Sequence, residues 1–291
     1  MKAAPGLSEL PIRRVVVGTE DADLTDVLAV EEPLEIILGM PENGKIVHQP
    51  VSITMRTPGA DFELAAGFLF TEGILSDAGQ IAQIRHFGVQ VKLNGLKNTV
   101  IVELNEGVKV DLKRLERNFY MTSSCGVCGK SSIEALHTGV KKVESGFIVN
   151  ADLVHTLTEL LRASQNVFDR TGGLHASALF YADGNLEIVR EDVGRHNALD
   201  KVIGAKFLSG ELPLTDRVLL VSGRVSFELV QKALMAGIPI LAAIGAPSSL
   251  AVELAEEYGM TLVGFVRDGR FNIYTAKERI KNTLHTGRVS A

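Results

Sequence analysis

The residues with the clearest chemical potential are Cys125 and Cys128, the only two cysteines among 291 residues. They form a CxxC pair within the segment MTSSCGVCGKSS, residues 121–132. Two thiols at this spacing can form half of a zinc site, cycle through a disulfide, or carry sulfur as a persulfide. The flanking Ser and Gly residues predict an exposed loop, and Lys130 with the helix expected after it favours the thiolate. A reactive thiol therefore ranks first, a zinc half-site second and a chance pairing last.

A zinc site needs two further ligands, because structural zinc is tetrahedral. The chain offers only scattered histidines such as His137, His175 and His196. Zinc-dependent nucleobase deaminases combine an H-x-E motif with a later P-C-x-x-C motif. Here His175 is followed by Ala and Ser, and the CxxC pair precedes it. Deaminase chemistry is therefore unsupported, and a histidine entering a buried strand is the preferred interpretation of His175.

Two predicted strand-to-helix junctions, residues 222–226 and 245–249, consist mostly of small residues. Helix N-termini attract anions, and open α/β sheets bind ligands at the carboxyl ends of their strands. Gly and Ser are also ordinary turn and cap residues. Both junctions together with Arg224 favour phosphate binding. The segment from Arg267 to Arg270 is either a hairpin turn around Asp-Gly or a pair of phosphate-binding arginines.

The run REDVGRHNALDK, residues 190–201, is richer in charge than the exit of a strand requires. Buried pairing among Arg190, Asp192, Arg195 and His196 would explain it, and so would a functional site. The sequence leaves these two explanations open.

The elements that must position these residues follow an α/β pattern. Asp61 is expected to cap a helix over residues 62–74, and 92–104 to form a hairpin. Downstream, apolar runs at 217–223, 239–245 and 261–266 alternate with helices, which predicts parallel strands in a layered domain. We expect an α+β domain at 11–120, an α/β domain at 121–276 and a tail at 277–291.

The composition narrows the functional class. The net charge of -5 and the pI of about 5.9 argue against a general nucleic-acid binder, which needs a basic surface. No apolar run has the length of a membrane span, and the first residues lack the apolar core of a secretory signal. Two cysteines do not form a disulfide framework. A cytoplasmic protein without membrane or nucleic-acid partners is expected.

Several long motifs in order resemble the formate dehydrogenase accessory sulfurtransferases, the FdhD family. The resemblance runs from about Arg56 to Thr275. It rests on RTPGADFELAAGFLFTEGI (56–74), SSCGVCGK (123–130), TGGLHASALF (171–180), EDVGRHNALDKVIG (191–204), SGRVSFELVQKA (222–233), APSSLAVELAEEYGMTLVGF (246–265) and the VRDGRFNIYT that follows.

The resemblance implies a cytidine-deaminase-like α/β/α layered domain preceded by a smaller α+β domain, in a homodimer. It implies that sulfur passes from a cysteine desulfurase to the bis-(molybdopterin guanine dinucleotide) molybdenum cofactor before its insertion into formate dehydrogenase. Cys125 would carry the persulfide, with Cys128 assisting. The implied cofactor-binding residues are Phe265, Val266, Arg267, Asp268, Gly269 and Arg270. The cofactor would be a bound substrate, with no resident cofactor or metal.

Two alternatives remain at this level, a zinc- or nucleotide-binding module without catalytic activity and a dithiol oxidoreductase. The relay order between Cys125 and Cys128 also stays open, as do the roles of His175, Asp192, Arg195, His196 and Arg224.

Overall fold

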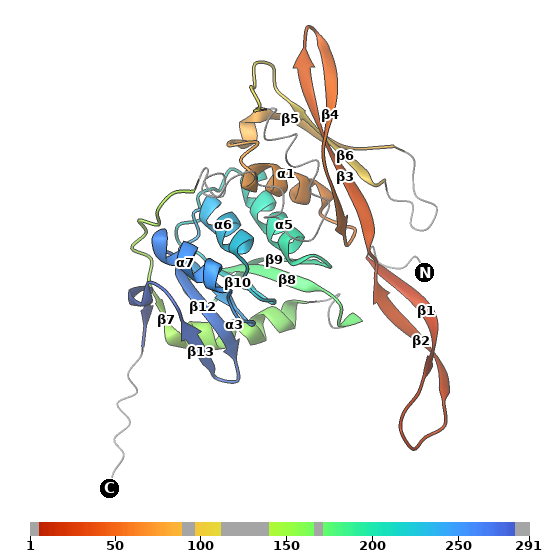
Figure 1. Ribbon diagram of the computed structural model, residues 1–291, viewed down its shortest axis with the longest axis vertical. Coiled ribbons are helices and arrows are strands. Elements are labelled where there is room, and N and C mark those ends of the chain that lie inside the picture. Colours follow the sequence, from red (N-terminus) through yellow and green to blue (C-terminus); the bar gives the residue numbers. More distant parts are fainter. Residues whose placement is uncertain (1–5, 89–96, 112–139, 166–170, 283–291) are drawn as a thin grey trace. The chain divides into compact units, whose positions relative to one another are not determined.

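The computed structural model describes residues 6–88, 97–111, 140–165 and 171–282 (Figure 1). The chain forms two compact units, and each is assembled from segments that are separated in the sequence. The first comprises Met1–Thr138, Gln165–Ala176 and Arg190–Glu211, and the second comprises the remaining residues. The mixed α/β class is confirmed. The units do not follow the expected boundaries at 120 and 276, because residues 165–176 and 190–211 return to the first unit.

The first unit contains a four-stranded sheet in the order β4-β3-β6-β5. Its strands are β3 (Glu32–Glu42), β4 (Lys45–Arg56), β5 (Ile81–Phe87) and β6 (Thr99–Leu104). β3 is parallel to β6, and the other neighbours are antiparallel. Alternate residues Leu34, Ile36 and Leu38 are fully buried, as expected for a strand with one face on a core. The antiparallel partner of β6 is β5, so the hairpin expected at 92–104 is wrong for the described part of that segment.

Helices α1 (Asp61–Thr71) and α5 (Arg195–Leu208) pack together in the first unit at two glycines. A Cβ on Gly67 would overlap the carbonyl oxygen of Asp200, and a Cβ on Gly204 would overlap that of Glu63. Only glycine permits this close backbone approach. The short 3-10 helix η1 (Ala78–Gln80) follows α1 and precedes β5.

Asp61 does not cap α1, contrary to the expectation from the sequence. The N-cap is Ala60, with φ of 55° and no side-chain cap hydrogen bond. Instead, the Asp61 carboxylate accepts hydrogen bonds from Arg56 Nε at 3.0 Å and Arg56 Nη2 at 3.1 Å. Arg56 is completely buried, and a buried guanidinium requires a paired carboxylate more than a helix requires a cap.

Strands β1 (Leu7–Arg14) and β2 (Ala22–Ala29) form a separate antiparallel ribbon in the first unit. Figure 1 shows this ribbon projecting away from the four-stranded sheet of the same unit. The two strands stay paired one residue beyond their ends, where the Val30 amide donates to the Gly6 carbonyl at 2.8 Å.

The second unit is built on a six-stranded sheet in the order β13-β12-β11-β10-β8-β9. The strands are β8 (His175–Phe180), β9 (Leu186–Asp192), β10 (Val218–Val221), β11 (Ile240–Ala243), β12 (Thr261–Arg267) and β13 (Arg270–Ile273). The first residues of β8 and the last of β9 count with the first unit. β10, β11 and β12 are mutually parallel, which confirms the expected parallel pairings.

Helices α6 (Phe227–Met235) and α7 (Ser249–Glu257) connect the parallel strands and contact each other. Helix α3 (Ala151–Ser164) packs against β12 and β13 through a buried stripe that includes Leu153, Leu157 and Leu161. None of the helices in the described ranges has the length and apolar character needed to cross a bilayer.

The expected tail at 277–291 is wrong for its first residues. The 3-10 helix η3 (Lys277–Arg279) leads into β14 (Ile280–Lys281), which pairs in parallel with β7 (Val149–Asn150). Arg279 donates to the Gly259 carbonyl at 2.8 Å. These contacts are distant in sequence, so local periodicity carried no sign of them.

Candidate functional site

The structure describes the predicted cofactor-binding residues but not the predicted catalytic cysteines. Cys125 and Cys128 lie outside the described residues, as do Lys130 and His137. The predicted cofactor segment, Phe265 to Arg270, is described and lies in the second unit, where β12 ends and turns into β13.

The carboxyl ends of β10, β11 and β12 lie side by side, so the structure brings both predicted junctions next to the cofactor segment. The Gly245 amide donates to the Gly223 carbonyl at 3.2 Å, and the Val225 amide donates to the Ala246 carbonyl at 3.1 Å. The Phe265 amide donates to the Gly245 carbonyl at 3.1 Å. Three loops that follow parallel strands therefore form one connected rim, the place where open α/β sheets bind ligands. We call residues 222–226, 245–249 and 265–270 the strand-end rim.

Packing between these loops explains two of the glycines. A Cβ on Gly245 would lie 2.9 Å from the Arg224 amide nitrogen and the Gly223 carbonyl oxygen. A Cβ on Gly264 would lie 2.9 Å from Pro247 Cδ. The small residues are thus required by the contact between loops, independently of any ligand.

Both helices that leave the rim begin where the sequence predicts. Ser226 is the N-cap of α6, and Ser248 is the N-cap of α7. The Ser248 hydroxyl accepts a hydrogen bond from the Ala251 amide at 3.3 Å, which satisfies one of the unpaired amides of the first turn. Arg224 is exposed between β10 and α6.

The cofactor segment has an irregular backbone. Phe265 adopts φ of 56°, an outlier for a bulky residue, and the register with β13 shifts between Gly264 and Arg267. Asp268 and Gly269 have φ of 53° and 68°, which confirms the hairpin turn around Asp-Gly. The Arg267 guanidinium lies 5.7 Å from the centre of the Phe265 ring. Strained backbone of this kind is concentrated at functional sites.

The six predicted residues differ in exposure. Arg267, Asp268, Gly269 and Arg270 are exposed, whereas Phe265 is half-buried. Val266 is only 1% exposed, so its side chain belongs to the core. The part of the segment that is free to meet a ligand therefore consists of two arginines, the turn between them and one aromatic ring.

The charged run 190–201 is explained largely by buried pairing in the first unit. Asp192 is completely buried and lies 2.7 Å from Lys201 Nζ. Lys201 also donates to the Thr57 carbonyl at 2.9 Å, and Asp192 accepts from the Thr57 amide at 3.1 Å. Arg190 forms a two-pronged ion pair with Glu63. Neither the role of Thr57 nor the burial of Lys201 was predicted from the sequence.

His175 is half-buried at the start of β8. Burial lowers its pKa below the ordinary histidine value, and the positive charge of Arg195 lowers it further, while Asp192 opposes this shift. His175 is therefore neutral near neutral pH. Among the residues that the structure describes, no group of three or more His, Cys, Asp or Glu side chains could hold a metal ion.

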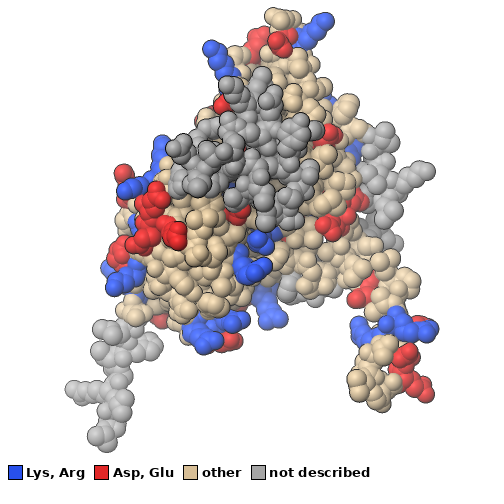
Figure 2. Space-filling model, viewed as in Figure 1, with Lys and Arg blue, Asp and Glu red and all other residues tan. Residues whose placement is uncertain are grey.

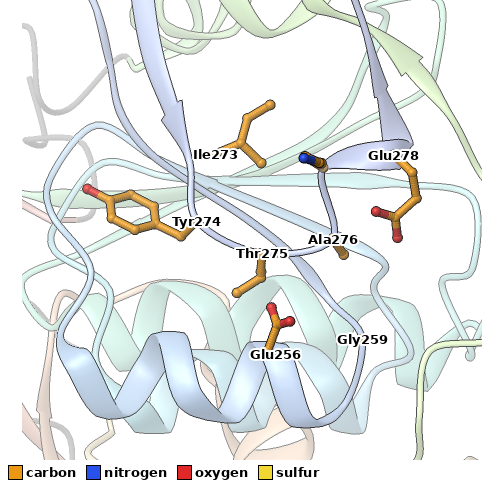
Figure 3. A pocket seen from close by; sticks show the side chains of 8 residues that line it. Glu256, Gly259, Ile273, Tyr274, Thr275, Ala276 and Glu278 are labelled. Atoms are coloured by element: carbon orange, nitrogen blue, oxygen red, sulfur yellow. The ribbon is translucent and has the colours of Figure 1, made fainter.

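A shallow hollow of about 420 Å³ lies beside the last strands of the second unit. Figure 3 shows Glu256, Tyr274 and Glu278 around it, with Thr275 between them. None of the predicted site residues lines this hollow. Acidic side chains gather over α7 (Figure 2), where Glu253, Glu256 and Glu257 are exposed. The two carboxylates that line the hollow, Glu256 and Glu278, outnumber its one cation, Lys277, so it is a poorer phosphate site than the strand-end rim.

Comparison with known proteins assigns the chain to a family. The model of the FdhD/NarQ family matches residues 29–281. The sulfur carrier protein FdhD of Streptomyces avermitilis is 51% identical over 275 residues, covering 92% of this chain and 95% of the relative. The protein of the same name from Mycobacterium tuberculosis is 50% identical over 276 residues, covering 92% and 97%. That from Sulfolobus acidocaldarius is 42% identical over 259 residues, covering 89% and 93%.

The fold has a counterpart among solved structures. A crystal structure from Desulfotalea psychrophila, assigned to the formate dehydrogenase accessory proteins, superposes with a TM-score of 0.69 at 26% sequence identity. The match covers 95% of this chain and 100% of the other.

Proposed function

The chain belongs to the FdhD/NarQ family, and on that premise we propose that it is a sulfur carrier that serves formate dehydrogenase. It takes sulfur from a cysteine desulfurase and delivers it to the bis-(molybdopterin guanine dinucleotide) molybdenum cofactor, which is its substrate. The observation that carries this proposal is 51% identity over 92% of the chain to a protein named as a sulfur carrier. The free thiols that such chemistry needs favour a reducing cytoplasm.

The sulfur transfer is written through the cysteine pair. The Cys125 thiolate attacks the terminal sulfur of the donor persulfide, the donor S–S bond breaks, and the donor leaves as a thiolate. The new S–S bond holds a zero-valent sulfur on Cys125. Transfer to the substrate breaks this bond and returns the Cys125 thiolate, and the reduced molybdenum supplies the two electrons that turn the sulfur into sulfide. Cys128 assists by stabilising or receiving the persulfide.

Mass spectrometry of the intact protein tests the sulfur transfer. The full chain is incubated with a cysteine desulfurase and cysteine, and the mass is read without reductant. We expect an increase of one sulfur atom that is lost in Cys125→Ala and retained in Cys128→Ala. An unchanged mass of the wild-type protein would refute the sulfur-carrier function. An adduct that survives only in Cys125→Ala would reverse the roles of the two cysteines.

We place the cofactor phosphates on the strand-end rim. Arg267 and Arg270 are exposed on either side of the Asp-Gly turn, and α6 and α7 begin in the other two loops of the same rim. An arginine can bind a phosphate through two parallel hydrogen bonds, and a helix start adds a favourable dipole. Phe265 contributes the one aromatic ring of the cofactor segment. These features support binding of an anionic nucleotide.

Guanosine diphosphate is a suitable probe for this site, because it reproduces the nucleotide part of the substrate. Arg267→Gln or Arg270→Gln should weaken its binding about tenfold, the loss expected for one charged hydrogen bond. Arg13→Gln is the matched control, since Arg13 is an exposed arginine of the β1–β2 ribbon. If calorimetry gives the same affinity for the wild type and all three variants, the phosphates do not bind at this segment.

We also propose that the chain forms a homodimer through the β1–β2 ribbon. Leu10, Leu24 and Leu28 are 46%, 41% and 40% exposed, and the strand register places them with Ile12 on one face of the ribbon. The other face carries the ion pair of Arg13 and Asp23. A two-stranded ribbon is marginally stable alone, so an apolar face on it favours a covering partner. Analytical ultracentrifugation should show a dimer that Leu10→Ser with Leu24→Ser dissociates.

A further inference from the structure

One side of β13 carries three exposed side chains in a row. Alternate residues of a strand lie on the same side, which places Arg270 and Asn272 together. The pairing with β12 continues one residue past the end of β13, because the Tyr274 amide donates to the Leu262 carbonyl at 2.8 Å. Tyr274 therefore follows on the same side, and it is 37% exposed. We call Arg270, Asn272 and Tyr274 the β13 stripe.

The β13 stripe lies beside the strand-end rim in the second unit. Asn272 is the ladder partner of Gly264, so the two residues share one face of the sheet. A Cβ on Gly264 would lie 3.1 Å from Tyr274 Cε2 and 2.9 Å from Pro247 Cδ. The Tyr274 ring and Pro247, a residue of the rim, therefore flank the same glycine. Figure 3 shows this ring extending away from Glu256.

The polar groups of the stripe are available to a ligand. Within the ranges that the structure describes, the side chains of Asn272 and Tyr274 form no hydrogen bond. Over the same ranges Arg267 and Arg270 form no ion pair, and the Arg267 guanidinium lies over the Phe265 ring. A cation, an amide and a phenol thus follow one another along the strand that leaves the rim, and no other described side chain engages them.

The charges around the stripe give it a direction. One end carries Arg267 and Arg270, whereas Tyr274 at the other end lines the hollow together with Glu256 and Glu278. A phosphate is attracted to the first end and repelled from the second. A ribose and a base carry no charge, so the carboxylates do not exclude them. A nucleotide would therefore lie with its phosphates at the arginines and its base towards Tyr274.

We propose that the β13 stripe binds the nucleoside part of the nucleotide, with Asn272 at the ribose and Tyr274 stacked on the base. This inference rests on the proposed function, because it requires that Arg267 and Arg270 hold the phosphates. Side chains on one side of a strand follow at about 6.8 Å, so cation, amide and ring come in the order of phosphate, ribose and base. The amide offers a donor and an acceptor to the ribose hydroxyls, and an aromatic ring can stack on any base.

Calorimetry on the full chain tests this site with two probes, guanosine diphosphate and inorganic pyrophosphate. Tyr274→Ala should weaken the binding of guanosine diphosphate about tenfold, the effect of losing one stacked base, and should leave pyrophosphate binding unchanged. Tyr274→Phe should recover most of the affinity, because it keeps the ring. Tyr181→Ala is the matched control, since Tyr181 is 38% exposed and lies in the same unit.

A change at Asn272 tests the ribose contact. Asn272→Ala should weaken the binding of guanosine diphosphate about fivefold, the effect of one neutral hydrogen bond, again with no change for pyrophosphate. Adenosine diphosphate should lose affinity in Tyr274→Ala by a factor similar to that for guanosine diphosphate, because stacking does not select the base.

Two results would overturn the inference. One is an affinity for guanosine diphosphate that stays unchanged in both Tyr274→Ala and Asn272→Ala. The other is a loss of pyrophosphate affinity in Tyr274→Ala, because the change would then act on the arginines and not on a base contact. The proposed phosphate site fails in a different way, by an unchanged pyrophosphate affinity in Arg267→Gln and Arg270→Gln. The sulfur-transfer assay on Cys125 reads a separate event.

A measurement on the wild-type protein covers the case in which Tyr274→Ala fails to fold. The side-chain amide resonances of Asn272, assigned by comparison with Asn272→Ala, should shift on addition of guanosine diphosphate and much less on addition of pyrophosphate. Those of Asn185, whose amide donates to Asp183 Oδ2 at 2.7 Å, should not shift. Asn272 resonances that stay unchanged at saturation with the nucleotide would refute a nucleoside on the β13 stripe.

Discussion

Breaking the buried pair of Asp192 and Lys201 should destabilise the first unit strongly. In Lys201→Met, a side chain of similar length replaces the lysine, which is 2% exposed. The carboxylate of Asp192 then loses its ion-pair partner, which lies 2.7 Å away. Removing one member of a buried pair costs about 3 to 5 kcal/mol. Asp192 retains three donors, the amides of Thr57 and Gly194 and the Asn197 side chain, so we expect about 3 kcal/mol.

The reverse change should cost more. In Asp192→Asn, the new NH₂ group faces donors whose hydrogen bonds the carboxylate oxygen accepted. Lys201 remains as a buried cation. We therefore expect about 5 kcal/mol, the upper end of the same range. The combined variant Asp192→Asn with Lys201→Met should cost less than the sum of the two single changes, because no uncompensated charge remains.

Urea denaturation followed by circular dichroism and by amide hydrogen exchange of α5 measures these free energies of unfolding. Arg13→Gln, which removes an exposed ion-pair member, is the control and should leave the curve unchanged. A cost for Lys201→Met within about 0.5 kcal/mol of zero, the range of ordinary surface substitutions, would refute the assignment of a buried, mutually dependent pair. Strict additivity in the combined variant would refute it equally.

Three further changes test other features of the first unit. Gly204→Ala should destabilise the protein by about 2 kcal/mol in the same denaturation assay. The new Cβ overlaps the Glu63 carbonyl at a cost of about 3 kcal/mol, and the higher helix propensity of alanine returns about 1 kcal/mol. Gly146→Ala is the matched control, because a Cβ there meets open space. The pKa of His175 lies below its ordinary value of 6.5, so the unfolded state binds more protons below pH 6.5. The free energy of unfolding should therefore fall as the pH drops below 6.5, and a pH series on His175→Gln should show a smaller fall. Ala60→Gly should raise the free energy of unfolding by about 1 kcal/mol in thermal denaturation, because glycine adopts the left-handed φ of 55° without strain and is also the better N-cap; a lower melting temperature would contradict this.

Local patterns were sufficient for the parallel strands of the second unit and the helices that connect them. Short apolar runs gave β10, β11 and β12, since a strand buried on both faces needs no alternation. Ser226 and Ser248 marked the helix starts because their hydroxyls suit an N-cap, and Asp268-Gly269 marked the turn because it tolerates positive φ. Each of these signals depends on a few neighbouring residues, so it can be recognised from the sequence alone.

Part of the strand-end rim also followed from the sequence. Both junctions were expected to bind phosphate at the carboxyl ends of their strands, and parallel strands end at the same edge of a sheet. The left-handed Phe265 and the burial of Val266 were not expected, because they depend on how the end of β12 packs against the loop that contains Gly245 and Pro247. The cofactor segment itself came from the family resemblance.

Tertiary structure alone decided which charges are buried and which segments meet. Asp61 was expected to cap a helix, but its carboxylate pairs with Arg56 instead. Lys201 was given no role from the sequence, and the structure buries it against Asp192 and Thr57. The same holds for the contact of Gly67 with Gly204. Each of these contacts joins segments whose partners no local periodicity specifies. Their stability comes from exclusion of water, and only the assembled unit provides it.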